Sequence, residues 1–118
     1  MNKKRELNQE DLEMAKYIVD ILFYDKIKVM SWGFHNPRVI PDGIRFNVQG
    51  YVHTGVVEVI YNHGWDLFLV RFLSPNYELI KEIDMVYFDD LLDLIDEKVE
   101  SGGSQSQFLG VLQNVSWN

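Results

Sequence analysis

The chain has 118 residues, of which 47% are hydrophobic and 14% aromatic, and its 18 acidic against 11 basic side chains give a formal net charge of -7. This composition has enough apolar material for one packed domain, which excludes a disordered chain and argues against two domains. The absence of cysteine excludes disulfides, thiolate zinc sites and cysteine nucleophiles.

The negative charge is concentrated in one segment. Residues 1–77 carry nine acids and nine bases, residues 78–100 carry nine acids against Lys81 and Lys98, and residues 101–118 carry no charged side chain. The whole excess of -7 therefore belongs to residues 78–100. Repulsion of nucleic acid is a local property of that segment.

The first predicted element is a helix over residues 9–25. Asn8 is a favourable N-cap, and Asp11 places a carboxylate in the first turn, where the helix dipole favours negative charge. Apolar residues recur at helical spacing over a broad face between Leu12 and Tyr24. Such an amphipathic helix needs an apolar surface to cover.

The next two predicted elements are a strand and a loop. Residues 26–34 begin with alternating lysines and apolar side chains, a period of two that is typical of a strand. Residues 35–43 contain two prolines and the turn sequence Pro41-Asp42-Gly43, which predict a loop.

Two hairpins follow, with strands predicted over residues 44–53, 56–61 and 66–73. A turn at Thr54-Gly55 places Val52 opposite Val57, and a four-residue loop at 62–65 places Val59 opposite Phe68. A one-residue slip would bury Arg71, so this alternation defines the inner face. That face is predicted to carry Phe46, Val48, Val52, Val57, Val59, Tyr61, Phe68, Val70 and Phe72.

An edge strand over about residues 77–83 and a helix over 88–100 complete the predicted domain. The fold class is α+β: a single domain over residues 1–100, in which a four- to five-stranded antiparallel meander carries the N-terminal and C-terminal helices on one face. Residues 101–107 are predicted to form a flexible linker. Residues 108–118 form an apolar segment expected to dock on the domain or on a partner.

One end of this sheet offers a weak metal site. The predicted loops bring together His35, His63, Asp42 and Asp66, and two imidazoles with a carboxylate suit a divalent cation. His53 is excluded, because a strand of about 20 Å separates it from His63. None of the spacings matches a ligand motif, and ordinary turn chemistry is the favoured interpretation, so no cofactor is expected.

The outer sheet face mixes basic, aromatic and apolar side chains. It is predicted to be either a partner-binding surface or a solvated face, and Glu58 is expected to form a surface ion pair with Arg71. Binding of a single nucleic-acid strand is the less favoured alternative, because the net charge is negative. The candidate contact residues here are Arg45, Tyr51, Leu67, Leu69 and Arg71.

The acidic helix and the C-terminal segment offer two further surfaces. Asp93, Asp96 and Glu97 lie on a helix with about half the charge density of B-DNA, so a DNA-mimic inhibitor that fills a basic cleft is an alternative to a solvated face. In the C-terminal segment the candidate contacts are Phe108, Leu112 and Trp117. A homodimer through this segment or through the sheet edge is also an open alternative.

These features predict a non-enzymatic, cytoplasmic protein-interaction module with an unknown protein partner. No glycine-rich phosphate loop, nucleophile motif or metal-ligand spacing points to an enzyme. No apolar run is long enough to span a bilayer, so no membrane association is expected. The alternatives are an inhibitor that presents the acidic helix and a metal-dependent site at the His35, His63 and Asp66 end of the sheet.

Overall fold

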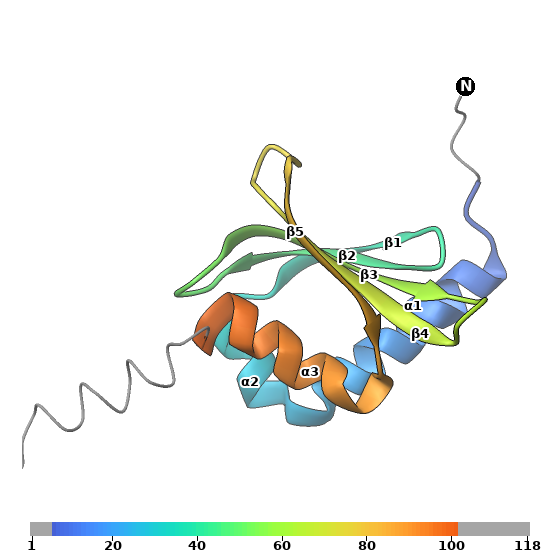
Figure 1. The fold of residues 1–118 in the computed structure, drawn as a ribbon, viewed down its shortest axis with the longest axis horizontal. Helices are drawn as coiled ribbons and strands as arrows, with labels where there is room; N and C mark the ends of the chain where they lie inside the picture. Colours follow the sequence, from blue (N-terminus) through green and yellow to red (C-terminus); the bar gives the residue numbers. More distant parts are fainter. Residues whose placement is uncertain (1–5, 102–118) are drawn as a thin grey trace, which may run out of the picture.

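One five-stranded antiparallel sheet, with helices lying against a single face, organises the chain (Figure 1). The computed structural model describes residues 6–101, so the predicted linker after Ser101 and the predicted contacts Phe108, Leu112 and Trp117 lie outside the described residues. The strands follow each other in the order β1-β2-β3-β4-β5, which confirms the predicted α+β meander with two helices and the larger of the two expected strand numbers.

Helix α1 (Gln9–Leu22) begins at the predicted cap. The Asn8 side chain accepts a hydrogen bond from the Asp11 backbone N–H at 3.0 Å, and the Asp11 carboxylate accepts one from the Asn8 N–H at 2.9 Å. Asp11 is buried, and its other oxygen accepts the Asp42 N–H at 2.8 Å. The capping box therefore also attaches the start of α1 to the turn between β1 and β2.

The strand predicted over residues 26–34 is wrong, because this stretch is helical. A short 3₁₀ turn η1 (Phe23–Asp25) leads into α2 (Lys26–Ser31), whose N-cap Asp25 accepts the Lys28 N–H at 3.1 Å. The alternation covers too few residues to distinguish a strand from one helical turn. Val29 is buried, whereas Ile27 is 82% exposed, which a shared strand face would not produce.

The loop predicted over residues 35–43 is also wrong in its first part. Residues His35–Ile40 form β1, which pairs with β2 (Gly43–Gln49) through the predicted turn at Pro41 and Asp42. A proline is tolerated here because β1 is an edge strand, where a backbone N–H has no partner to lose. The pairing is irregular between His35 and Arg38, and Asn36 has a positive φ of 56°.

Both predicted hairpin registers are shifted by an even number of residues. Val57 of β3 (Thr54–Asn62) lies opposite Phe46 instead of Val52, and Val59 lies opposite Val70 of β4 (Leu67–Leu73) instead of Phe68. The second loop has the predicted four residues, at 63–66. Even shifts keep every side chain on its face, so the predicted inner face holds, except that Val52 leaves the strand and is 49% exposed.

Strand β5 (Leu79–Val86) forms the far edge of the sheet and leads into α3 (Phe88–Asp96), which continues as a short wider turn, η2 (Glu97–Ser101). The predicted edge strand and C-terminal helix are both confirmed, with β5 extending to Val86. The pairing of β5 with β4 is interrupted twice by irregularities. These irregularities and the charged side chains of β5 weaken it as a template for another strand.

The core lies between the inner face of the sheet and the helices. Trp32, at the end of α2, is fully buried and stacks on Phe46 with ring centroids 6.4 Å apart. Helices α1 and α3 each contribute a buried stripe at helical spacing. The cluster consists of Ala15, Ile18, Leu22, Val29, Trp32, Ile44, Phe46, Val48, Val57, Val59, Phe68, Val70, Phe72, Val86, Leu91, Ile95 and Val99.

The loop between β2 and β3 holds η2, the continuation of α3. The Val99 carbonyl accepts the Val52 N–H at 2.8 Å and the His53 N–H at 3.1 Å, so the loop satisfies a carbonyl at the helix end. Gly50 lies so close that a Cβ there would be 2.3 Å from the Val99 carbonyl oxygen. The C-terminal helix is thus held on the sheet by backbone hydrogen bonds as well as by side-chain packing.

We expect Gly50→Ala to lower the free energy of unfolding by about 1–3 kcal/mol, because the added methyl group must push the loop away from Val99. Urea denaturation measures the change. Gly64→Ala is the matched control, since its nearest contact would be the Asn62 side-chain oxygen at 3.3 Å. Equal stabilities of the two variants would contradict this role of Gly50.

Candidate functional site

The predicted metal site is not assembled. His63 and Asp42 do meet, with His63 Nε2 2.9 Å from Asp42 Oδ1, and Asp66 lies in the same loop as His63. His35, however, pairs with Asn47 at the other end of β1, so its predicted place beside His63 is wrong. The prediction failed because it treated residues 35–43 as a loop, whereas β1 carries His35 away from the turn.

At the same end of the sheet, Asp66 is hydrogen-bonded to a neighbouring tyrosine. The Tyr61 hydroxyl donates a hydrogen bond to Asp66, and this bond raises the pKa of Tyr61 above its usual value near 10. Within residues 6–101, no group of three or more histidine, aspartate or glutamate side chains is arranged to hold a metal ion.

A row of charged side chains crosses the outer face of the sheet, on all five strands. Each member lies directly opposite the next, so the row follows from the strand registers. Signs alternate from the second member onward. We call it the outer charged row: Arg38, Arg45, Glu58, Arg71 and Glu82.

Glu58 is the centre of this row, and it is only 4% exposed. Arg45 donates to one carboxylate oxygen of Glu58 from Nε at 2.7 Å and approaches it with Nη2 at 2.6 Å, while Arg71 Nη1 lies 3.6 Å from the other oxygen. The predicted ion pair with Arg71 therefore exists, but it is buried at its acidic end and shared with Arg45. Because the Glu58 carboxylate is buried, loss of its partners would cost more than loss of the exposed ion pair expected from the sequence.

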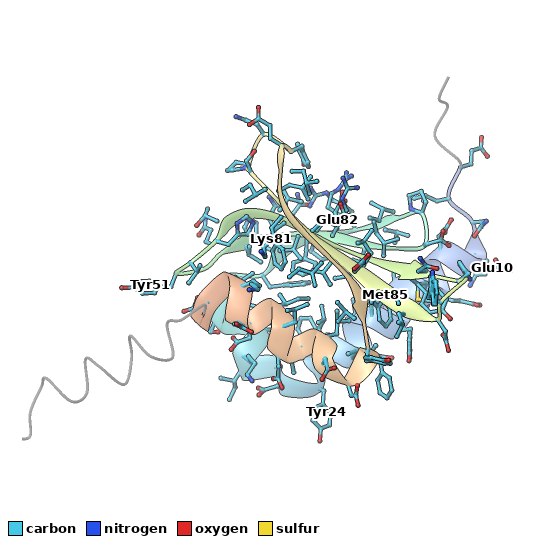
Figure 2. The ribbon with its side chains drawn as sticks, in the orientation of Figure 1. Glu10, Tyr24, Tyr51, Lys81, Glu82 and Met85 are labelled. Atoms are coloured by element: carbon cyan, nitrogen blue, oxygen red, sulfur yellow. The ribbon has the colours of Figure 1, made fainter. Side chains whose placement is uncertain are left out.

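The turn between β4 and β5 covers part of this row. Tyr77 accepts a hydrogen bond from Arg38 Nη2 at 2.7 Å, and its ring lies 5.3 Å from the guanidinium carbon of Arg45. Glu82, the last member of the row, lies on β5 opposite Arg71 and is labelled in Figure 2. The arginines of the outer face are thus largely engaged within the molecule.

Of the other predicted outer-face contacts, two lie on the outer face and one does not. Leu67 and Leu69 of β4 are half-buried, opposite Asn62 and Ile60 respectively. Tyr51 lies in the loop between β2 and β3, not on a strand, and its side chain is 73% exposed at the end of the sheet (Figure 2). Leu67 and Leu69 therefore share the outer face with Arg45 and Arg71, whereas Tyr51 lies apart from them.

The three acids predicted on the C-terminal helix have different surroundings. Asp96 accepts a hydrogen bond from the buried Trp32 indole N–H at 2.9 Å, so it supports the core. Asp93 pairs with Lys28 of α2 at 3.2 Å, and this hydrogen bond raises the pKa of Lys28 above 10.5. Glu97 is exposed.

A groove of about 660 Å³ lies between the helices. One wall is a stripe at spacings of three and four residues that runs from α1 into η1, formed by Tyr17, Asp20, Ile21 and Tyr24. The other wall is the first turns of α3, formed by Phe88, Asp89, Leu92 and Asp93. Asp25 and Lys28 complete its lining. We call this the helix groove.

The walls of the helix groove are aromatic and its rim is acidic. Tyr24 is 91% exposed and points away from the domain in Figure 2, and Phe88 is 58% exposed. Four aspartates line the groove against the single lysine, which gives the lining a formal charge of -3. Exposed aromatic rings around a recess are typical of binding surfaces.

Sequence reasoning missed this groove as a site. It identified Asp93 but not Tyr17, Ile21, Tyr24 or Phe88. The available signal was the width of the apolar face of α1, which exceeds what the buried stripe from Ala15 to Leu22 needs. The pairing of that surplus with the start of α3 depends on tertiary contacts.

Comparison of the chain with protein-family models, with curated protein sequences and with solved structures found no match. In the part of the chain that the structure describes, no helix has both the length and the apolar character needed to cross a membrane.

We expect Glu58→Gln to lower the free energy of unfolding by about 2 kcal/mol, because two arginines lose the charge that compensates their partial burial. Urea denaturation tests this, with Glu82→Gln as an exposed control in the same row that should change stability by less than about 0.5 kcal/mol. Double-mutant cycles should give stronger coupling of Glu58 to Arg45→Met than to Arg71→Met. A Glu58→Gln protein as stable as the control would contradict the central role of Glu58.

We expect Asp96→Ala to destabilise the fold by about 1–2 kcal/mol, because it leaves the buried Trp32 N–H without its acceptor. Glu97→Ala, one residue away and exposed, should be neutral within about 0.5 kcal/mol. Thermal and urea unfolding measure both. If the two variants are equally stable, Asp96 is a surface acid like its neighbour.

Proposed function

We propose that this protein is a non-enzymatic protein-interaction module that binds its partner through the helix groove. The observation that carries the proposal is the exposure of Tyr24 and Phe88 on opposite sides of a recess with apolar walls. Burying aromatic side chains supplies much of the free energy of protein association, and such side chains dominate interface hot spots. A volume of about 660 Å³ is large enough for several partner side chains.

The outer sheet face is less well suited to this role. Its arginines already contact Glu58, Asn47 and Tyr77. A partner there would have to replace hydrogen bonds and ion pairs that the protein makes internally, which returns little net free energy. The helix groove offers apolar surface whose burial needs no such exchange.

The acidic helix supports a related second candidate, an inhibitor or regulator that presents α3 to a basic cleft. Asp93 is exposed, and Asp89 and Asp90 lie in the first turn of the helix. This candidate uses the charges of α3 without the aromatic walls. Removing the rings therefore distinguishes the two candidates.

The test is affinity capture with the purified full chain, comparing variants that differ in which exposed side chains they lack. Tyr24→Ser with Phe88→Ser should weaken binding of the captured protein about 100-fold or more, because two aromatic anchors are removed. Tyr51→Ser with Trp65→Ser is the matched control, since it removes two exposed rings that do not line the groove and should leave binding within about twofold.

The outer face is tested in the same experiment. Leu67→Ser with Leu69→Ser should retain the complex, after circular dichroism has verified the fold of each variant. Loss of binding with this pair but not with the groove pair would contradict the proposal in favour of the sheet face. Retention of every partner by all variants would contradict it altogether.

A further inference from the structure

We infer that the occupant of the helix groove is a cationic amphipathic segment of another protein, bound as a helix of about two turns at the contact. This inference rests on the proposed function and adds the chemistry of the partner. The charge of the groove, the geometry of its walls and the composition of the alternative occupants carry it.

The charges in the groove are arranged for a cation. Asp20 and Asp25 lie on the α1 side and Asp89 and Asp93 on the α3 side, so acids flank the apolar walls on both sides. Within residues 6–101 only Asp93 has a salt-bridge partner among them, which is Lys28 at 3.2 Å. Lysine or arginine side chains of a ligand would meet carboxylates on either side, which favours association and orients the ligand.

The walls match the spacing of a helix. Tyr17, Ile21 and Tyr24 follow each other at i, i+4 and i+7, which corresponds to about 10 Å along α1 and the following turn η1. Phe88 and Leu92 present one matching turn on α3. A helix lying between two helices buries side chains at the same spacings, so the ligand should carry apolar anchors at i, i+3 or i+4, and i+7.

The chain itself does not supply a matching occupant. A second copy bound symmetrically through this groove would place the same four aspartates against each other, which is repulsive. Residues 102–118 carry apolar side chains but no charge, so they leave the acidic rim without a counterpart. The complement of the groove is therefore a basic segment of a different protein.

Substitutions of Lys28 and of the groove aspartates should change the affinity for a cationic ligand in opposite directions. Lys28 competes with a cationic ligand for Asp93, because its ammonium group already donates to that carboxylate. Lys28→Met should raise the affinity for a cationic ligand by about threefold at low salt, whereas Asp20→Asn with Asp89→Asn should lower it by about fivefold. A variant that merely damaged the fold would not increase the affinity.

The experiment selects ligands for the immobilised full chain from a library of random peptides of about 16 residues, roughly 24 Å as a helix. Selected peptides are measured individually by fluorescence anisotropy. We expect them to be rich in lysine and arginine with apolar residues at helical spacing, and to bind Tyr24→Ser with Phe88→Ser at least tenfold more weakly. Raising the salt from about 0.05 to 0.5 M should weaken binding about tenfold.

The matched control changes the same charge elsewhere. Glu78→Gln with Asp84→Asn removes two exposed acids from the β5 region and should alter the affinity less than twofold. If this control lowers the affinity as much as Asp20→Asn with Asp89→Asn, net charge and not the groove selects the ligand, and the inference fails. It also fails if Lys28→Met does not raise the affinity.

The remaining outcomes separate this inference from the proposed function. Selected peptides that depend on Tyr24 and Phe88 but are uncharged or acidic would leave the groove as a binding site and overturn its cationic occupant. Displacement of the selected peptides by a synthetic peptide of residues 102–118 would assign the groove to the chain's own C-terminal segment and overturn it as well. Selection of no groove-dependent peptide overturns it, while the capture experiment judges the proposed function independently.

Discussion

The width of the sheet relative to the helices that cover it determines most of the surface of this molecule. The four gaps of about 4.8 Å between five strands separate the two edge strands by roughly 19 Å, which is about the width of two helices side by side, each about 10 Å across. Helices α1 and α3 direct their buried stripes at the strands, so their flanks meet over the inner face. The helix groove lies along this seam, where Tyr17, Tyr24 and Phe88 line it and Lys28 of α2 completes the lining.

The inner and outer faces of the sheet are covered by different kinds of side chains. The inner face is apolar and packs on the helices, while the outer face carries the outer charged row. Its central member, Glu58, lies on the middle strand between Arg45 and Arg71, whose charged groups compensate its buried carboxylate. Alternation along β3 places Val57 and Val59 on one face and Glu58 on the other, so one strand serves both faces.

The fold class could be predicted from the sequence, but the segments 26–34 and 35–43 could not, because their local patterns fit more than one structure. The N-cap Asn8, the strand alternation and the C-terminal helix are local signals, and the structure confirms them. The four alternating residues from Lys26 to Val29 fit both a strand and a helix, and only the burial of Val29 and Trp32 in the core selects the helix. His35 was misplaced as a result of the loop assigned to residues 35–43, which in fact begins with the edge strand β1.

By itself, the sequence determined the class of fold, the inner and outer faces of the strands and the location of the negative charge, because each depends on the order of side chains along the chain. Only the tertiary structure decided the registers, which depend on where the loops close, and the roles of the acids. Asp96 supports Trp32 and Glu58 joins two arginines because the fold places distant residues within 4 Å of each other. The helix groove is of the same origin: its two walls are more than 60 residues apart in the chain, and only their packing on one sheet brings them together.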